Sequence, residues 1–260
     1  MFRTLVVSLA ALLVLGCSSA ERPYLGTWVP SQDAIDVSNF TVGYEMLDSV
    51  SYQVTADNQT YLIRTDGSET DTPWGGTVAI RVIDSMTWES SYRVDGNVIG
   101  VDTLLLSPDG QGLTIRSNNL IATQGPQLTV MELRREGEGS GLAGSWKGTT
   151  MSGEAFGEIS FVARGSEGIT ASFPAMQATC SPDFDGSDAA ATSPMMDDGW
   201  TCAMNTTESG ALLLTWKRAG EPRYTSEYTV SADGNQMTEV MAAVGTDEPV
   251  TINYQRRTDQ

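Results

Sequence analysis

An internal repeat is the feature that most restricts how this chain can fold. The motif Gly26-Thr27-Trp28 returns as Gly144-Ser145-Trp146. Farther along, Leu106-Ser107-Pro108-Asp109-Gly110 is matched by Val230-Ser231-Ala232-Asp233-Gly234, and near the ends a segment closing at Arg135 is matched by one closing at Arg256. Three anchors in the same order indicate a duplicated module of about 110 residues, an ordinary domain size.

The repeat predicts two units and the segment that joins them. We expect the first unit at residues 24–136 and the second at residues 142–258. Glycine dominates the connecting residues 137–141. A composition of this kind is typical of a flexible linker.

Both units carry short segments rich in Val, Ile, Thr and aromatic residues, several of them alternating between apolar and polar positions. Predicted strands are Val50–Thr55, Thr60–Arg64, Thr77–Ile83, Met86–Val94, Phe156–Ala163, Ile169–Phe173, Leu212–Lys217, Tyr224–Val230 and Val250–Arg256. Asp95-Gly96 and Asp233-Gly234 are typical of the turns between such strands. Ser31–Val37 has the composition for a single helical turn. The pattern therefore predicts an all-β chain, folded as antiparallel barrels or sandwiches.

The N-terminus has the layout of an export signal. Arg3 precedes an uncharged apolar run from Leu5 to Leu15, which is shorter than the roughly 20 residues that cross a bilayer as a helix. The run ends in Val14-Leu15-Gly16-Cys17, which resembles the bacterial lipobox. This resemblance implies removal of residues 1–16, acylation of Cys17 with palmitate or similar chains, and a lipidated tether at residues 17–23. Ser18 then favours the outer membrane of a Gram-negative cell over the inner one. An ordinary secretory signal with a chance cysteine is the alternative.

The remaining cysteines agree with export. Cys180 and Cys202 form an even pair once Cys17 is assigned to lipid, and an oxidising compartment favours a disulfide between them. Closing a loop of this size stabilises a fold by about 3 kcal/mol in the chain-entropy model. Two buried free thiols are the alternative.

The Trp motif and the late Arg resemble the lipocalin-like fold. In that family a Trp near the start of the first strand plugs one end of a barrel of eight strands, and an Arg from the last part of the barrel lies across it. The resemblance implies two tandem lipocalin-like barrels, with Trp28 paired to Arg135 and Trp146 paired to Arg256. Relatives often enclose a small apolar ligand, whereas others have filled barrels, so the fold alone does not decide the function.

Charge and residue content exclude several functions. The chain has 33 acidic and 15 basic residues, a net charge of -18, and no histidine. Such a surface repels nucleic acid and anionic lipid headgroups. Solubility is the simpler explanation of the charge, and a cation or a basic partner is the alternative. Without histidine, His-based triads, bases and metal sites are excluded. We expect no enzymatic activity and no cofactor.

Two further groups of residues are candidate binding sites. Asp183, Asp185 and Asp188 form an acidic cluster between the paired cysteines, but the spacing fails the EF-hand pattern, which makes a solvated loop the preferred interpretation over a calcium site. Methionine is concentrated in the second unit, where it suits either an ordinary core or an adaptable apolar pocket. Trp74 and Trp200 follow turn-like segments and are candidates to line a barrel rim.

These observations give one expectation and one alternative. The first is a non-enzymatic envelope lipoprotein that binds a small apolar ligand or a lipid in one barrel. The alternative is a structural or interaction lipoprotein with filled barrels, which acts through its surface in an envelope complex. The sequence does not identify a protein partner.

Overall fold

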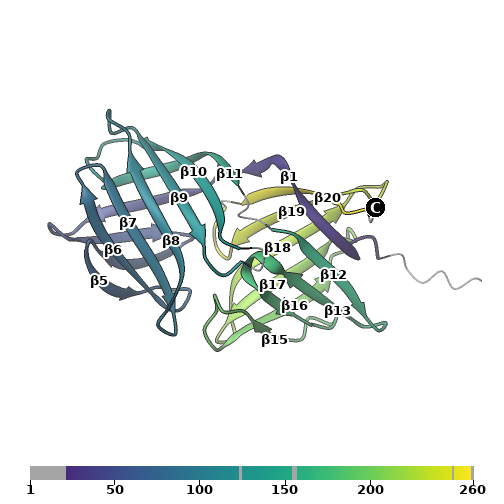
Figure 1. Cartoon of the computed structure of the whole chain (residues 1–260). Coiled ribbons are helices and arrows are strands. Elements are labelled where there is room, and N and C mark those ends of the chain that lie inside the picture. The colour runs from purple at the N-terminus through teal and green to yellow at the C-terminus, as the bar shows by residue number, and fades with distance from the viewer. Residues whose placement is uncertain (1–21, 123–124, 154–156, 248, 259–260) are drawn as a thin grey trace, which may run out of the picture.

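The chain folds into two antiparallel β-sheets that each roll up into a barrel (Figure 1). The computed structural model describes residues 22–122, 125–153, 157–247 and 249–258. Among these residues the one helical element is a 3-10 turn, η1 (Pro174–Met176). The predicted all-β fold with two barrels is therefore confirmed.

The first sheet, barrel 1, has ten strands in the order β4-β3-β2-β11-β10-β9-β8-β7-β6-β5. Its strands are β2 (Thr41–Met46), β3 (Ser51–Ala56), β4 (Gln59–Arg64), β5 (Asp66–Asp71), β6 (Thr77–Asp84), β7 (Thr87–Val94), β8 (Asn97–Leu106), β9 (Gly112–Asn119), β10 (Gln127–Glu136) and β11 (Gly144–Gly153). The barrel is nearly closed. Its edge strands β4 and β5 meet at Thr65, whose N–H donates to the Val50 carbonyl (2.8 Å) and whose carbonyl accepts from Val82 (3.3 Å).

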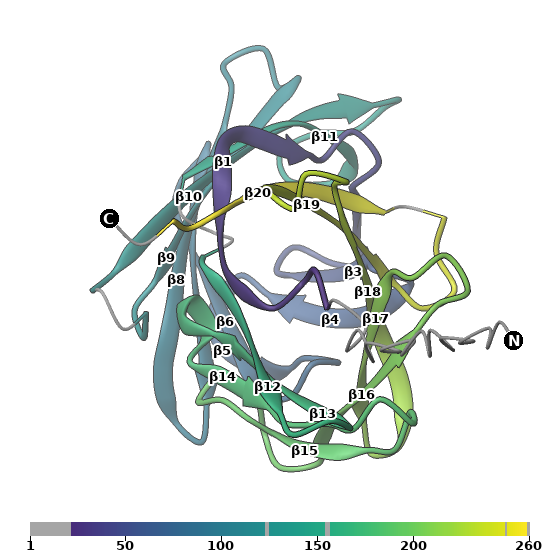
Figure 2. The ribbon, with the colours of Figure 1, turned by 90° about the vertical axis from the view of Figure 1, so that its right-hand side faces the viewer.

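The second sheet, barrel 2, also has ten strands and is fully closed (Figure 2). Its strands are β1 (Gly26–Asp36), β12 (Ile159–Arg164), β13 (Gly168–Phe173), β14 (Ala178–Cys180), β15 (Ala189–Thr192), β16 (Trp200–Thr206), β17 (Leu212–Arg218), β18 (Glu221–Val230), β19 (Gln236–Ala243) and β20 (Val250–Arg256). Strand β1 closes the ring because it pairs with both β12 and β20. Residues 31–36 continue this strand, so the helical turn predicted at Ser31–Val37 is wrong.

The two barrels exchange their first strands, which corrects the predicted domain boundaries. Strand β1 lies in barrel 2, although the sequence placed it at the start of the first unit. Strand β11, the expected start of the second unit, pairs with β10 and β2 of barrel 1. Residues 137–141 are accordingly the turn of the β10–β11 hairpin and do not link two separate domains. Barrel 1 is one continuous segment, and barrel 2 is assembled from both sides of it.

The exchange also corrects the predicted Trp–Arg pairs. The guanidinium of Arg256 lies 4.2 Å from the ring centre of Trp28, and that of Arg135 lies 4.0 Å from the ring centre of Trp146. The four predicted residues do form two Trp–Arg stacks, but with the partners interchanged. Each stack contributes about 0.5–2 kcal/mol beyond the burial of the ring.

The two stacks are built by equivalent hydrogen bonds, which supports the internal repeat. The indole N–H of Trp28 donates to the Tyr24 carbonyl (2.8 Å), and that of Trp146 donates to the Leu142 carbonyl (3.0 Å). Each arginine Nε donates to a glycine of the preceding Asp-Gly turn, Gly110 for Arg135 (2.8 Å) and Gly234 for Arg256 (2.6 Å). One module was therefore used twice.

Steric constraints explain why the Gly-x-Trp motif begins with glycine. Gly26 and Gly144 have φ of 127° and 140°, a region that side chains disfavour. A Cβ on Gly26 would lie 2.8 Å from the guanidinium of Arg256, and a Cβ on Gly144 would collide with Arg135. Glycine is required at both places because the arginine passes directly over the backbone on its way to the tryptophan.

The two plugged ends point away from each other, and the opposite ends of the barrels face one another (Figure 1). The inter-barrel side-chain hydrogen bonds described below come from loops at these facing ends and from strand residues close to them. The side chains buried in barrel 2 include Trp28, Phe161 and Tyr228, and those buried in barrel 1 include Trp88 and Trp146. Each barrel thus has its own core and covers the mouth of the other.

Candidate functional site

Trp74 joins the two facing mouths. It lies in the β5–β6 loop of barrel 1, its ring meets that of Tyr61 edge to face at 5.2 Å, and its indole N–H donates to the hydroxyl of Tyr224 on β18 of barrel 2. The expectation that Trp74 lines a rim is confirmed, whereas Trp200 is buried in the core of barrel 2. Aromatic side chains from both barrels therefore form one wall of the junction.

Polar contacts hold the same loop against barrel 2. Arg218 pairs with Asp197 within barrel 2 and also donates from Nη1 to the carbonyl of Pro73 (3.0 Å). On another side of the junction, Asn119 at the end of β9 donates to the Ala175 carbonyl (2.5 Å). Because these bonds come from separate loops, the relative position of the two barrels is fixed at several points.

A pocket of about 140 Å³ lies between the barrels at this junction. Both barrels and the crossover segment between β1 and β2 contribute to it. Its lining residues are Val37, Phe40, Asp57, Met131, Met151, Tyr224, Met241, Ala242, Ala243 and Val250. The lining is predominantly apolar, with three thioethers, two aromatic rings and one carboxylate, which is the composition expected of a small-molecule site.

Asp57 and Tyr224 are the polar groups of this pocket. The Tyr224 hydroxyl donates to the carboxylate of Asp57 (3.4 Å) across the barrel boundary. Burial raises the pKa of Tyr224, and the negative charge of Asp57 raises that pKa further. Burial and the same carboxylate also raise the pKa of Tyr61. Both phenols are therefore neutral donors at physiological pH, beside a carboxylate that gives the pocket a negative potential.

The interior of barrel 2 holds a buried carboxylate that does not belong to the junction. Glu239 accepts hydrogen bonds from Tyr228 (2.9 Å) and Tyr254 (2.7 Å), and burial raises its pKa. In the register of barrel 1, the paired residues Leu104 and Ile115 stand where barrel 2 pairs Tyr228 with Glu239. This polar cluster is therefore specific to the second copy.

The interior of barrel 1 has its carboxylate at a different position, on β8. Asp102 is paired in register with Ser117, accepts a hydrogen bond from Ser90 (3.2 Å), and has its pKa raised by burial. Tyr44 and Tyr61 share its side of the barrel and are only partly buried.

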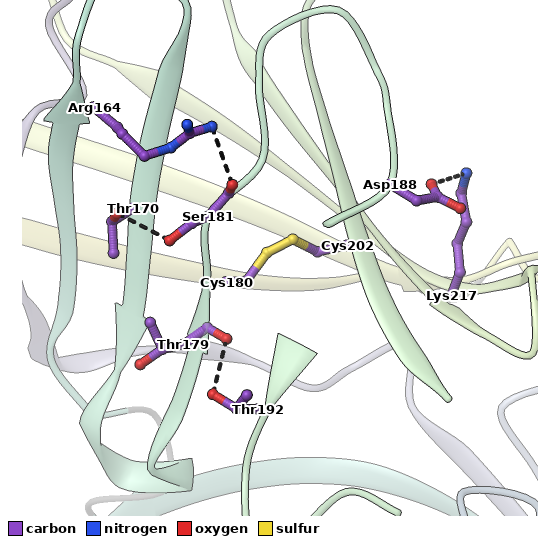
Figure 3. The surroundings of a disulfide bond; sticks show 9 residues. All are labelled: Arg164, Thr170, Thr179, Cys180, Ser181, Asp188, Thr192, Cys202 and Lys217. Atoms are coloured by element: carbon purple, nitrogen blue, oxygen red, sulfur yellow. Dashed lines mark hydrogen bonds and ion pairs between the residues drawn. A yellow bond between two sulfur atoms is a disulfide. The ribbon is translucent and has the colours of Figure 1, made fainter. Parts of the chain in front are cut away.

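The predicted disulfide is present in barrel 2. Cys180 on β14 and Cys202 on β16 are bridged across the intervening strand β15, with their Cα atoms 6.4 Å apart (Figure 3). Both cysteines are buried in the core. The bridge therefore holds together the part of the barrel with the shortest strands.

The three aspartates considered for calcium do not converge. Asp188 pairs with Lys217 at 2.6 Å (Figure 3). Asp183 pairs with Arg164, and Asp185 accepts from the backbone N–H of Ser187 in its own turn (2.8 Å). Within the described parts of the chain, no group of three or more acidic or cysteine side chains is arranged to hold a metal ion. The preferred interpretation of a surface loop agrees with this geometry.

Cys17 and the predicted signal peptide lie outside the described residues. Within the part of the chain that the structure does describe, no helix has the length and apolar character needed to cross a membrane. Comparison of the chain with protein-family models, with curated proteins and with solved structures found no match.

The sequence did not predict the junction pocket, because its lining is scattered over five strands and two connecting segments. The excess of methionine in the second unit was a partial signal, since Met151 and Met241 both line the pocket. No sequence pattern singled out Phe40 or Asp57. Their role depends on the crossover between barrels, which the repeat alone does not reveal.

Proposed function

We propose that this chain is a non-enzymatic lipoprotein of the bacterial envelope, with two lipocalin-like barrels that hold a small ligand between them. The observation that carries the proposal is the methionine-lined pocket of about 140 Å³, to which both barrels contribute. Ligand-binding sites commonly lie at domain interfaces and combine apolar walls with a few polar groups. The sequence predicted a ligand inside one barrel, whereas this pocket lies between the two barrels.

The anchor is inferred from the lipobox resemblance at Val14-Leu15-Gly16-Cys17. Arg22 donates to the carbonyl of Ser166 and lies over the ring of Phe184 at 4.7 Å, at the plugged end of barrel 2. A lipid on Cys17 would therefore attach a few residues from this end. We expect palmitate labelling of the wild type and none of Cys17→Ser in its own host. Equal labelling of the two proteins would disprove the anchor.

Ligand binding can be tested by native mass spectrometry of the protein purified from its own host. We expect a stoichiometric small mass that is retained by the folded protein. Ala242→Phe should abolish it, because Ala242 lines the pocket and the larger ring would fill the space. Val240→Phe is the matched control, since Val240 lies on the same strand, is 40% exposed and does not line the pocket. A mass that survives Ala242→Phe would place the ligand elsewhere.

A second candidate function is supported by an apolar surface at the plugged end of barrel 1. Two hairpin turns there carry exposed apolar pairs followed by Asp-Ser, namely Met46-Leu47-Asp48-Ser49 and Val82-Ile83-Asp84-Ser85. Asp48 and Asp84 each accept a backbone N–H within their own turn, so these turns are ordered. Thr65 hydrogen-bonds to Val50, beside the first turn, and to Val82, in the second. These two bonds hold the turns side by side as one surface. Clustered exposed apolar side chains of this kind mark protein interaction sites.

This second candidate predicts a protein complex that depends on the turns. We expect the double variant Leu47→Ser with Ile83→Ser to keep its stability and to lose a discrete larger assembly on native gels of host membranes. Val162→Ser, which removes an equally exposed apolar side chain from barrel 2, is the control. An assembly that persists in the double variant would exclude this surface as the contact.

A further inference from the structure

The junction pocket has walls that favour positive charge. Phe40 and Tyr224 present aromatic rings, and Met131, Met151 and Met241 present polarizable sulfur atoms. Aromatic faces attract organic cations by about 0.5–2 kcal/mol each, and surfaces of this type recognise quaternary ammonium groups. A purely aliphatic pocket would give no such preference.

A carboxylate lies in the same pocket. Asp57 lines it from the β3–β4 turn and accepts a hydrogen bond from the Tyr224 hydroxyl. Burial is the largest cause of the raised pKa values of Tyr61 and Tyr224, and the charge of Asp57 raises both further, whereas the positive charge of Arg223 lowers the pKa of Tyr224. Arg223 precedes Tyr224 on β18 but does not line the pocket.

The charge of the whole chain acts in the same direction. With a net charge of -18, the protein raises the local concentration of cations and lowers that of anions around it. A neutral ligand gains nothing from this field, whereas a cation is drawn to the junction. The acidic composition, for which solubility was the simpler explanation, thus matches the chemistry of the pocket.

The size of the pocket limits the ligand to a small group. A cavity of about 150 Å³ accommodates a molecule the size of benzene. At about 140 Å³, the junction pocket has room for a trimethylammonium or similarly compact ammonium group and is too small for a long acyl chain.

We propose that the junction pocket binds a small organic ammonium ion, with Asp57 as its counter-charge and Phe40 and Tyr224 as its aromatic walls. This inference rests on the proposed ligand-binding function and specifies the class of ligand. It replaces the neutral apolar ligand expected from the sequence.

Two probes of the same shape distinguish binding driven by positive charge from binding driven by apolar contact alone. Choline and its neutral carbon analogue 3,3-dimethylbutan-1-ol differ in a single atom, nitrogen against carbon. Isothermal titration of the detergent-solubilised full-length protein should show choline binding about tenfold more tightly than the alcohol, the factor expected from one or two cation–aromatic contacts. The choline affinity should fall as salt is added, because part of the attraction is long-range.

Variants test whether this pocket causes the preference for choline over the alcohol. Asp57→Asn and Phe40→Leu should each bring the choline-to-alcohol ratio close to one. Asparagine is a tolerated replacement because Asp57 has φ of 50°, a conformation in which Asn is enriched. Asp247→Asn is the matched control, since Asp247 is exposed, lines only the neighbouring groove and should leave the ratio unchanged.

The outcomes distinguish this inference from the function on which it rests. Equal affinity for both probes, abolished by Ala242→Phe, would overturn the ammonium assignment and keep the pocket as a ligand site. A choline preference that survives both Asp57→Asn and Phe40→Leu would also overturn it. Binding of neither probe would also overturn the ammonium assignment. If, in addition, protein from the host retains no small mass, the pocket function is excluded as well.

Discussion

Glu239 is the side chain that most clearly separates the two copies of the module. Its carboxylate lies inside barrel 2 between two tyrosine hydroxyls, at a position where barrel 1 has isoleucine. Burial raises its pKa above the value in the unfolded chain, so the folded state holds the proton more tightly. Its favourable contribution to stability is therefore complete below the unfolded pKa and is lost as the pH rises through the folded pKa.

Glu239→Gln removes this titration and keeps the shape of the side chain. We expect the melting temperature of the variant, relative to the wild type, to be highest at pH 8 and to fall as the pH is lowered towards 5. Other carboxylates with shifted pKa values, such as Asp102 and Asp66, are the same in both proteins and cancel in the difference. Melting temperatures that differ by a constant amount across this range would show that Glu239 does not titrate there.

At the scale of single residues, the sequence identified the side chains that form the Trp–Arg stacks, but it did not identify which Trp contacts which Arg. The repeat selected Trp28 and Trp146. Alternation along the last strand of each unit selected Arg135 and Arg256, which share a face with apolar residues of their own strands. Neither pattern specifies which barrel a strand joins. The pairing was wrong for that reason, although all four residues take part in Trp–Arg stacks.

At the scale of elements, the β5–β6 loop joins the barrels through one side chain. Trp74→Ala would remove the ring between Tyr61 and Tyr224 and leave the Tyr224 hydroxyl without its indole donor. Because Trp74 is only partly buried, we expect a loss of about 2 kcal/mol in the free energy of unfolding, below the usual cost of a core Trp→Ala change.

Urea denaturation followed by circular dichroism measures this loss. Trp74→Phe is the control for the ring, since it keeps an aromatic ring beside Tyr61 but lacks the N–H and the second ring of the indole, and its loss should be about half as large. Equal stability of Trp74→Ala and the wild type would mean that the loop rests on barrel 2 without contributing to the junction.

Nine of the 20 observed strands were predicted, each within about three residues of its observed bounds, as for β17 at Leu212–Arg218. The other eleven were not predicted individually. The alternation and the turn residues of the nine predicted strands are local properties, so the sequence shows them directly. The exchange of β1 and β11 depends instead on the short β10–β11 turn, which keeps β11 beside β10. Glycines in that turn were interpreted as a linker, but they are there to let Arg135 bind the carbonyls of Gly141 and Ala143.

At the scale of the whole molecule, the exchange predicts where the chain can be divided. Residues 41–153 contain every strand of barrel 1 together with Trp146 and Arg135. We expect this fragment to fold alone, with a β-type circular dichroism spectrum and a cooperative thermal transition. Residues 24–136, the unit suggested by the repeat, lack the strand that carries Trp146 and should remain unfolded. The reverse result would show that the first strands are not exchanged in solution.

The pairing of β1 also sets the order in which the two barrels can close while the chain is being made. Barrel 1 has all its strands once residue 153 has emerged, whereas β1 waits for β12 and then for the last strand, β20, before it is paired on both sides. The earliest described strand to be made is thus the last to be enclosed on both sides. One edge of β1 keeps its backbone groups unpaired until residues 250–256 have been made, so barrel 2 can close only when the chain is nearly complete.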